Sequence, residues 1–430
     1  MPPPRPHPLT RSRAAERIDG LLGKAWARGW SPRPDLTAEA ILAAGSKGFD
    51  AADEAGGRSE QEVADFRTRL AVLTRSLEEE AQLNNLGRTI AYGMLTRCVR
   101  QRFALGRLWR QRPELLTTPL APPIIVIGQM RGGTTRIHRL LAADPAHSFT
   151  RFCDSWDPVP ERPDLRPVKG VAALRMARIL NPWLDILHPM TATGVEEELG
   201  WLTVALSGSA FYTQWHIPTF TRWCEEADPA PAYAELARIL RTDAAHHGTA
   251  DRHRVMKVPE FTEAIPALLR MWPEARLVVT RRDPAQVADS AASLVAAQTA
   301  PQTDAADYET IRAEWVRKTA LRDARIIGDL ASCRNRKAIV DFAELDADWL
   351  TAIRCIYDAL GLDLSTAAIA GMEQAQRAAQ HDALGEHRRQ RRTFASEVKS
   401  APGSAFPSAS APPVAVHRPN SSATPPTDRP

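Results

Sequence analysis

The sequence of 430 residues lacks several features that mark particular classes of protein. It has only five cysteines, which are odd in number, widely spread and without a C-x-x-C pair, so neither a disulfide framework nor a zinc framework is expected. No run of about 18 apolar residues occurs, which excludes a transmembrane helix of the usual length. The opening residues, MPPPRPHPLTRSR, contain no apolar stretch typical of a secretory signal. These absences predict a cytoplasmic protein with reduced thiols and no integral membrane segment.

The chain also lacks a strong excess of either charge. It holds 55 basic and 51 acidic side chains, which gives a net charge of +4. This balance does not predict nucleic-acid binding, and a mildly positive field suits a small polyanionic ligand equally well. Metal-ligating residues form no cluster along the sequence, so no metal is expected. With 44% hydrophobic and 25% charged residues, the composition is typical of a globular protein.

The most informative stretch, PIIVIGQMRGGTTRIHRLLAAD, covers residues 123–144. The apolar run 124–127 predicts a buried strand, and the apolar spacing after the glycines predicts a helix that begins at Thr134. A glycine loop between a strand and a helix turns backbone N–H groups toward an anion, and the helix dipole favours negative charge there. Gly132 and Gly133 let the backbone approach that anion closely. The stretch therefore predicts a phosphate site, with an ordinary turn that binds nothing as the alternative.

The loop is not a Walker A motif, because the lysine of that motif is missing. Gly128 and Gly133 have the right separation, but Thr134 follows where the lysine should stand. The cation, Arg131, precedes the glycine pair instead, and Thr135 adds a second hydroxyl. This arrangement argues against an ATP-dependent kinase.

A second stretch, TRRDPAQVADS, covers residues 280–290. Arg282 follows a predicted strand, where α/β folds place ligand contacts. Asp283 suits the N-cap and Pro284 the first position of the next helix, on which Ser290 lies two turns further. An arginine and a hydroxyl at this place could hold a second phosphate. Read alone, they are equally compatible with a solvent-facing arginine and a helix serine.

The alternation of strands and helices predicts the fold class. Strands are expected at 124–127, 148–153, 254–258, 276–280 and 338–342, and helices between them. This pattern predicts an α/β protein with a P-loop-like three-layer α/β/α arrangement, a central mostly parallel sheet and additional helical regions. The expected division is a disordered N-terminus (1–12), a helical N-terminal region (13–120), an α/β domain (121–395) with a helical insertion at about 165–247, and a disordered tail rich in proline, serine and alanine (396–430).

Together the two stretches resemble the sulfotransferase superfamily, whose members use 3′-phosphoadenosine 5′-phosphosulfate (PAPS). The motif R-[SG]-G-T-T, a lysine at a strand end, and R-D-P followed by a serine eight residues after the arginine carry the resemblance. It extends over about residues 15–395 and is greatest to the bacterial sulfotransferase family that has an N-terminal helical region. Further similar segments are RQRPE (110–114), HPM (188–190), EEE (196–198), MKVP (256–259), WPEAR (272–276) and IYDALG (356–361).

The resemblance implies roles for the cofactor-binding residues. The loop Arg131, Gly132, Gly133, Thr134 and Thr135 would bind the 5′-phosphosulfate. The family usually has serine where this chain has Gly132, so one hydroxyl donor is missing.

Four further residues receive roles from the same resemblance. Arg282 and Ser290 would bind the 3′-phosphate, and Lys257 would lie near the transferring sulfuryl group or the acceptor. Arg136 would lie close to the nucleotide. The reaction implied is sulfuryl transfer from PAPS, without a metal, to a hydroxyl or amine of a small-molecule, lipid or glycan acceptor.

The general base is left open by the sequence. The family has a glutamate shortly before a P-x-P, and Asp154 matches that position, with a reach shorter by one methylene. Glu260, close to Lys257 in the sequence, ranks second, and His188 and Glu197 are further candidates. Each has a structural alternative, such as a cap or turn carboxylate for Asp154.

Two other functions remain as alternatives. One is a P-loop-type kinase that uses ATP and magnesium, for which Asp341 after an apolar run is the one metal-binding candidate. The other is a non-catalytic nucleotide-binding relative. The acceptor, the oligomeric state (a homo-oligomer is possible) and the purpose of the tail are not readable from the sequence.

Overall fold

A five-stranded parallel sheet forms the centre of the molecule in the computed structural model, which describes residues 5–381, the side chains of 379–381 excepted. The strand order is β2-β5-β1-β6-β7, and every pairing within it is parallel. The strands are β1 (Ile124–Ile127), β2 (His147–Ser148), β5 (His253–Met256), β6 (Arg276–Arg281) and β7 (Lys337–Asp341). The predicted parallel α/β fold is therefore confirmed.

Alternate residues of the strands enter two different hydrophobic cores, which makes the three layers. On β1, Ile124 and Val126 face one core, and Ile125 and Ile127 face the other. All four are fully buried, as expected for a parallel strand covered on both faces. The first face is covered by α6 (Thr134–Ala142), α17 (Phe342–Ala347), α18 (Trp349–Leu360) and α19 (Thr366–His381). The second is covered by α10 (Leu199–Val204), α13 (Ala230–His247), α14 (Ile265–Met271) and part of α16 (Tyr308–Ser332).

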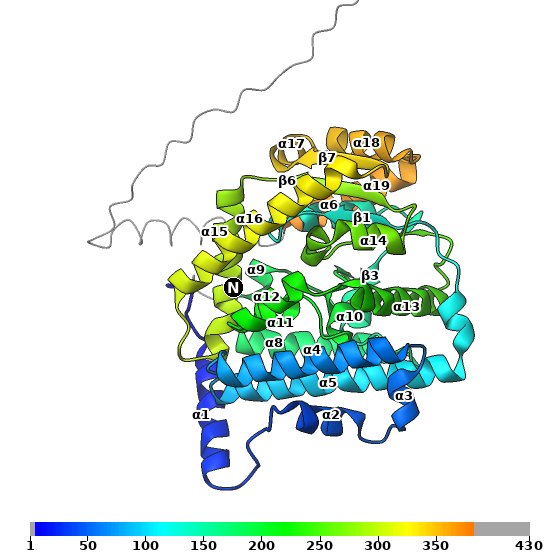
Figure 1. The fold of residues 1–430 in the computed structure, drawn as a ribbon. Helices are drawn as coiled ribbons and strands as arrows, with labels where there is room; N and C mark the ends of the chain where they lie inside the picture. The colour runs from blue at the N-terminus through cyan, green and yellow to red at the C-terminus, as the bar shows by residue number, and fades with distance from the viewer. Residues whose placement is uncertain (1–4, 382–430) are drawn as a thin grey trace, which may run out of the picture.

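Helices that precede the sheet in the sequence pack beneath the second layer (Figure 1). The two long ones, α4 (Glu60–Glu79) and α5 (Asn85–Gln111), carry apolar residues at helical spacing and share a core with α15 (Pro284–Thr299) and α16. The shorter ones are α1 (Arg13–Ala27), α2 (Ala38–Ser46), α3 (Ala51–Ala55) and the 3-10 turn η1 (Pro113–Thr117). Within residues 5–381, no helix has the length and apolar character that a membrane crossing requires.

The segment between β1 and β5 is mostly helical, as predicted, with two differences. The strand expected at 148–153 was wrong: it is divided into β2 and the two-residue β3 (Thr150–Arg151), and a short helix, α7 (Phe152–Trp156), follows. The helical insertion expected at about 165–247 is interrupted by strand β4 (Val195–Glu196), which pairs antiparallel with β3. The other helices here are α8 (Arg166–Leu180), α9 (Leu184–Leu187), α11 (Ser209–Tyr212) and α12 (Pro218–Glu226).

Helix boundaries follow local chemistry that the sequence displays. Ser59 and Glu62 form a reciprocal capping box at the start of α4. The Asp283 carboxylate accepts from the Ala285 backbone N–H at the start of α15. Gly361 ends α18 with a φ of 62°, a left-handed conformation that glycine adopts without steric cost.

Residues 5–12, which fall in the N-terminus predicted to be disordered (1–12), make contacts with the rest of the chain. Arg5 is buried, and its guanidinium donates to the hydroxyl of Ser293 on α15 at 3.2 Å and to the carbonyl of Pro8 at 3.0 Å. Arg11 pairs with Asp304. These contacts hold residues 5–12 against the body of the protein. The predicted tail at 396–430 lies outside the described residues.

Candidate active site

The loop between β1 and α6 has the backbone geometry of an anion site. Gly133 precedes the first residue of α6 with a φ of 92°, and Arg131 has a φ of 69°. An arginine whose backbone adopts the left-handed conformation is uncommon. Such residues cluster at functional sites, where the surrounding structure compensates the backbone strain. A β-carbon at Gly133 would lie 2.2 Å from the ring of Phe342, so only glycine fits there. The loop therefore turns sharply enough to leave the first N–H groups of α6 facing outward.

Arg131, Arg282 and Ser290, which are far apart in the sequence, meet beside this loop. The Arg131 Nε donates to the Ser290 Oγ at 3.2 Å, and its Nη1 donates to the carbonyl of Leu187 at 3.0 Å. The Arg282 Nη1 donates to the Arg131 carbonyl at 2.9 Å. The structure thus brings together the three residues that the sequence connected with phosphate binding. Two guanidinium groups and a buried hydroxyl at one place can bind a doubly charged phosphate.

Phe342 forms a wall of this site that the sequence analysis did not find. Its ring lies against Gly133, and the Arg282 guanidinium stacks over it at 4.4 Å. Arg136, one turn into α6, pairs with Asp346 at 2.9 Å on α17. The ring and the ion pair fix α17 beside the loop. Phe342 follows β7 directly, and a position just after a parallel strand was the signal that could have identified it.

Lys257 lies on the other side of the loop, just past β5. Its buried ammonium group donates to the Thr135 Oγ1 at 3.3 Å and forms an ion pair with Glu197. Thr135 is in the first turn of α6. A cation, a hydroxyl and a carboxylate therefore gather at the loop, at the edge where a transferred group would lie.

Glu197 has two titratable neighbours, His188 and Glu196. The His188 Nε2 lies 3.2 Å from a carboxylate oxygen of Glu196. Burial by itself would raise the Glu196 pKa, but the charge and hydrogen bond of His188 lower it to about 2. His188 thus lies against Glu196, whereas Glu197 pairs with Lys257. The sequence contained this group as the HPM and EEE segments but could not show that they converge on the loop.

Glu198 anchors the backbone of Lys257. Its Oε2 accepts from the Lys257 backbone N–H at 2.9 Å, and its Oε1 accepts from the Thr150 hydroxyl at 2.7 Å. Burial raises the Glu198 pKa to about 7, against the lowering effect of these hydrogen bonds. The residue connects β3, the end of β5 and the start of α10.

Asp154, which ranked first as base, lies in a buried ionic network. Its carboxylate accepts from Arg151 at 2.5 and 2.8 Å, and it pairs with Arg166 at 3.2 Å and His247 at 3.3 Å. Burial favours the neutral form, but these cations hold the Asp154 pKa well below its usual range. Such a carboxylate is a weak proton acceptor. Among the hydrogen-bonding and ionic partners described for Asp154, none belongs to the loop, and Asp154 as the base stays a prediction from the sequence.

Glu260 is buried at the start of η2 (Pro259–Glu263), and burial raises its pKa. One carboxylate oxygen accepts from the backbone N–H of Ser209. Its surroundings include Arg322, which pairs with Glu263 at 2.8 Å. Glu260 therefore belongs to a buried charge cluster between η2, α11 and α16, and its described contacts include none to Thr135 or Arg131.

Two groups of carboxylates and histidines lie close enough to share a cation, which the sequence did not reveal. One is Asp154, Asp243 and His247, and the other is His188, Glu196 and Glu197. The first group is already balanced by arginines, since Arg254 pairs with Asp243 and two more arginines pair with Asp154. The second is paired with Lys257. In both groups, arginine or lysine side chains of the protein balance the charges of the carboxylates.

The two strands beside β1 both lead into cations. β5 runs into Lys257, and β6 runs into Arg282. Asp341, the candidate metal ligand of a kinase, instead caps α17 at the edge strand β7, where it accepts from the Ala343 N–H. A parallel sheet with a glycine loop after its first strand, cations on both flanks and a helix N-terminus behind it defines a P-loop-like transferase of anionic groups.

The chain belongs to the sulfotransferase family, because the sequence model of that family matches residues 122–366. The crystal structure of sulfotransferase STF1 from Mycobacterium tuberculosis H37Rv is similar, with 26% identity, a TM-score of 0.68, and coverage of 84% of this chain and 98% of that one. Sulfotransferase STF9 from Mycobacterium avium shares the fold, with 20% identity, a TM-score of 0.71, and coverage of 86% and 98%. Among curated proteins, none matches the sequence. Sulfotransfer is thus the activity that family and fold support.

Proposed function

We propose that this protein transfers a sulfuryl group from PAPS to a hydroxyl or amine of its acceptor. The observation that carries the proposal is that Arg131, Arg282 and Ser290 converge beside the glycine loop, with Lys257 on its opposite side. A nucleotide with phosphates at both its 3′ and 5′ positions needs two separate cationic subsites. In this assignment Arg282 and Ser290 hold the 3′-phosphate, and the loop 131–135 holds the 5′-phosphosulfate.

The charges around the loop favour PAPS over ATP with magnesium. A nucleotide that carries magnesium requires a carboxylate near the phosphates to hold the ion. Here both neighbours of β1 supply cations, Lys257 and Arg282, and the adjacent carboxylate Glu197 is already paired. Direct arginine and lysine contacts suit sulfate and phosphate without a metal.

Glu197 is the residue to which we assign the general base. In the reaction the acceptor oxygen or nitrogen forms a bond to sulfur while the bond from sulfur to the bridging oxygen breaks. Lys257 stabilises the charge that develops on the leaving oxygen. When Lys257 turns toward that oxygen, the Glu197 carboxylate is released to take the acceptor proton.

Gly132 is compatible with this function despite the missing serine. A β-carbon there would lie 2.9 Å from the Gln129 carbonyl, which accepts from the Gly132 N–H at 2.9 Å. The Gln129 side chain is in turn fixed to α16 through the Thr319 carbonyl and Asp323, both at 2.8 Å. This tight turn leaves no room for a side chain, so backbone N–H groups replace the hydroxyl.

A thermal-shift titration with 3′-phosphoadenosine 5′-phosphate, compared with ADP and with ATP and magnesium, tests the donor site. A ligand that binds only the folded state must raise the melting temperature by mass action. We expect a shift with the bisphosphate that Arg282→Ala abolishes. The matched control is Arg281→Ala, which removes the exposed neighbouring arginine and should leave the shift intact. A shift with ATP and magnesium alone would refute the proposal and favour a kinase.

Transfer itself is tested by incubating the protein with labelled PAPS and a panel of small-molecule, lipid and glycan alcohols and amines. Labelled product that depends on Lys257 supports the enzyme. Bisphosphate binding without transfer to any acceptor class would instead indicate a non-catalytic nucleotide-binding protein.

A further inference from the structure

Helix α8 exposes an apolar face that nothing in the described chain covers. Val168, Val171, Met176 and Ile179 are 46–67% exposed, and they fall on one side of the helix. The opposite side of α8 packs against the rest of the protein, because Gly170 and Leu174 are buried there. A helix that is apolar on both sides is normally buried on both. The outer side of α8 therefore has the composition of a contact surface.

Basic side chains border this apolar face. Lys169 lies along one edge and Arg178 along the other, and Arg175 lies between them. Residues 162–180 contain five basic and one acidic side chain. Lys169 pairs with Asp157 and Glu161, and Arg178 pairs with Asp185 on α9, whereas for Arg175 no ion pair is found in the part of the chain that the structure describes.

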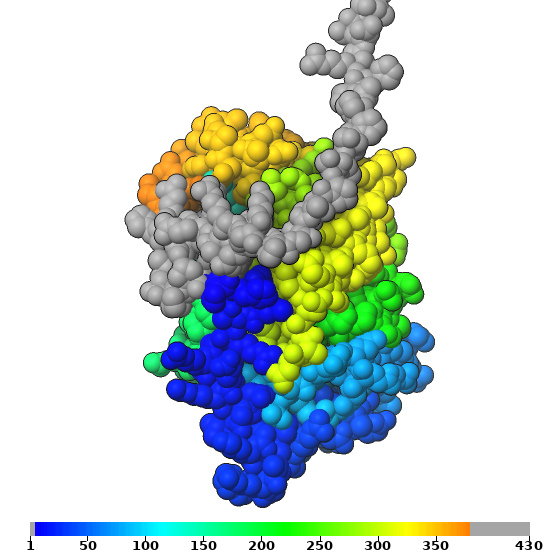
Figure 2. Space-filling model, turned by 90° about the vertical axis from the view of Figure 1, so that its left-hand side faces the viewer, coloured from blue at the N-terminus to red at the C-terminus, as the bar shows by residue number. Residues whose placement is uncertain are grey.

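Helix α1 extends the same surface. The Ser12 hydroxyl, at the start of α1, donates to the carbonyl of Leu180 at the end of α8 at 2.8 Å, so the two helices adjoin. Leu21 and Trp30 are 65% and 72% exposed, and the Arg28 guanidinium lies 4.8 Å from the centre of the Trp30 ring. Residues 13–30 hold four basic and two acidic side chains. Figure 2 shows α1 in blue across the face turned to the viewer.

We propose that the α1–α8 surface, meaning the exposed sides of these two helices, binds an anionic lipid bilayer. Exposed valine, methionine, isoleucine and tryptophan side chains enter the boundary between head groups and acyl chains, and the lysines and arginines meet anionic head groups. Arg166 is buried and paired with Asp164, and Lys169 and Arg178 are paired with acids outside the segment; without these residues the two segments hold six basic and two acidic side chains. This concentration of charge selects an anionic surface over a second copy of the protein, whose own basic residues would be repelled.

The position of α8 relates this surface to the reaction. Only residues 181–183 separate α8 from α9, and the carbonyl of Leu187 at the end of α9 accepts from Arg131. A surface that touches lipid head groups therefore continues to the sulfuryl-transfer site. The acceptor class that follows, and that rests on the proposed function, is an amphiphile whose hydroxyl or amine lies in the head-group layer.

Vesicle sedimentation tests the surface without relying on activity. The protein is mixed with vesicles of phosphatidylcholine alone or with equal parts of phosphatidylglycerol, at low and high salt. We expect binding to the anionic vesicles that weakens with salt. Each basic residue at an anionic surface contributes about fivefold to partitioning, so Arg175→Glu should weaken binding on the order of twentyfold. Val168→Asp with Val171→Asp should weaken it at least as much.

The matched control is Ile327→Asp, which introduces an acid at a residue 72% exposed on α16. It should leave vesicle binding unchanged. An intact thermal shift with the bisphosphate shows that each variant is folded, and Arg175→Glu carries the test if the double variant does not fold. Absence of vesicle binding, or equal loss with Ile327→Asp, would overturn the proposal. So would a dimer that the double variant abolishes, because a second copy would then be the occupant.

The test separates this inference from the proposed function. If the native protein shows no thermal shift with the bisphosphate, the proposed donor site is contradicted. Vesicle binding by the α1–α8 surface is then still tested by the sedimentation experiment alone. Vesicle binding together with transfer only to water-soluble acceptors would refute the lipid acceptor.

Discussion

The cations around a carboxylate decide whether it can serve as a base. Asp154 and Glu197 are both conspicuous acids near motifs, but Asp154 forms ion pairs with two arginines and a histidine in a buried network. Glu197 has one cationic partner, Lys257. In the proposed reaction Lys257 can turn away from Glu197 to stabilise the leaving oxygen of the donor. The difference is one of environment, because the two side chains have nearly the same intrinsic acidity.

Glu197→Gln should therefore lower kcat by about 10² to 10⁴-fold while nucleotide binding persists, because the proton acceptor is lost and the fold is kept. The measurement is transfer from labelled PAPS under saturating donor, with the bisphosphate thermal shift as the check on binding. Unchanged kcat would remove Glu197 as the base.

Asp154→Asn should act on stability instead. Removing the Asp154 charge leaves the buried Arg166 and the partly buried Arg151 with Asp164 alone as counter-charge, which costs about 3 kcal/mol. Urea unfolding measures this loss. A stable Asp154→Asn protein that binds nucleotide but has lost transfer would restore Asp154 as the base.

Gly133 has a separate, conformational role. Gly133→Ala should lower the free energy of unfolding by about 2 kcal/mol and abolish the bisphosphate shift, since its φ of 92° and the Phe342 ring both exclude a β-carbon. Gly93→Ala is the matched control: a β-carbon there meets no atom within 4 Å on α5, and it should stabilise by up to about 1 kcal/mol. Equal effects of the two changes on stability and binding would contradict the role of Gly133.

At the scale of secondary-structure elements, the end of β5 is held by a carboxylate that titrates near neutrality. Glu198 connects β3, α10 and the Lys257 backbone, and burial raises its pKa to about 7. The folded state therefore binds a proton more tightly than the unfolded chain, whose glutamate has an ordinary pKa near 4.3. The contribution of Glu198 to stability must then fall as the pH rises from about 4.5 through 7.

Glu198→Gln removes this titration. The unfolding free energy of the variant relative to the native protein should rise by roughly 3 kcal/mol between pH 5 and pH 8. Urea unfolding at several pH values measures the difference. A difference that stays constant over this range would show that Glu198 keeps an ordinary pKa.

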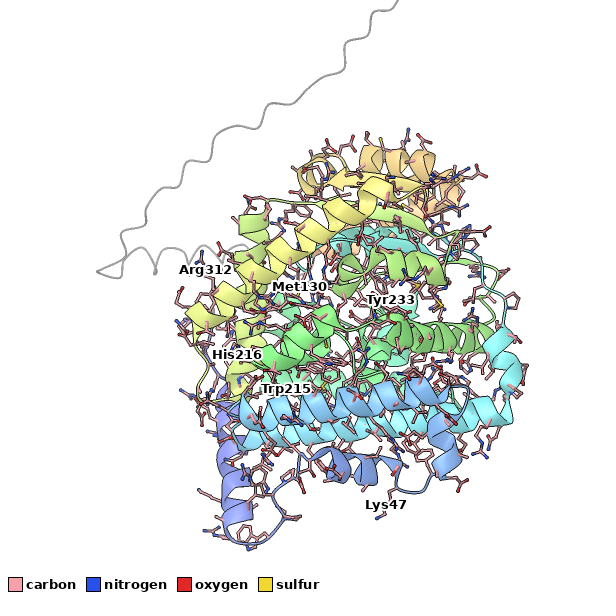
Figure 3. The ribbon with its side chains drawn as sticks, in the orientation of Figure 1. Lys47, Met130, Trp215, His216, Tyr233 and Arg312 are labelled. Atoms are coloured by element: carbon pink, nitrogen blue, oxygen red, sulfur yellow. The ribbon has the colours of Figure 1, made fainter. Side chains whose placement is uncertain are left out.

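The elements also explain how the loop is placed. The side chain of Met130 lies near the centre of the molecule, between the sheet and the helices beneath it (Figure 3), where it packs with Leu187 and Leu294. Its neighbour Arg131 faces Ser290. The loop therefore contacts the hydrophobic core through Met130 and the polar site through Arg131. These contacts restrict the conformations of both residues.

At the scale of the whole molecule, the N-terminal helices share hydrophobic cores with the α/β part. The core that contains α4 and α5 also contains residues of α12, α15 and α16. A buried ion pair adds to it: Arg58 donates to Glu235 on α13 at 2.9 Å, and both side chains are almost fully buried. Arg58 also lies 4.9 Å from the centre of the Trp109 ring.

Arg58→Ala should destabilise the entire protein by about 3–5 kcal/mol, because Glu235 remains buried without its partner. Calorimetry should show one cooperative transition, shifted to lower temperature. A separate early transition for the N-terminal helices would contradict the continuous core.

Secondary-structure elements that depend on neighbouring residues could be predicted from the amino-acid sequence. Apolar runs predicted the strands, capping residues such as Ser59 and Asp283 marked helix starts, and the motifs contained the residues that the structure brings together beside the loop. The sequence-based prediction misjudged the segment 148–153, where Thr150 and Arg151 pair with β4 and a short helix follows, because pairing between strands 44 or more residues apart has no local signal.

Only the tertiary structure decided which charges meet. Asp154 and Glu197 were both acids in suggestive motifs, and the packing of α8 and α13 surrounded one with arginines and a histidine while β5 brought Lys257 to the other. A carboxylate's proton affinity depends on distances of a few ångströms to groups that are remote in sequence. Residue type and spacing therefore identified the reaction class, and the fold determined which side chains are placed to carry it out.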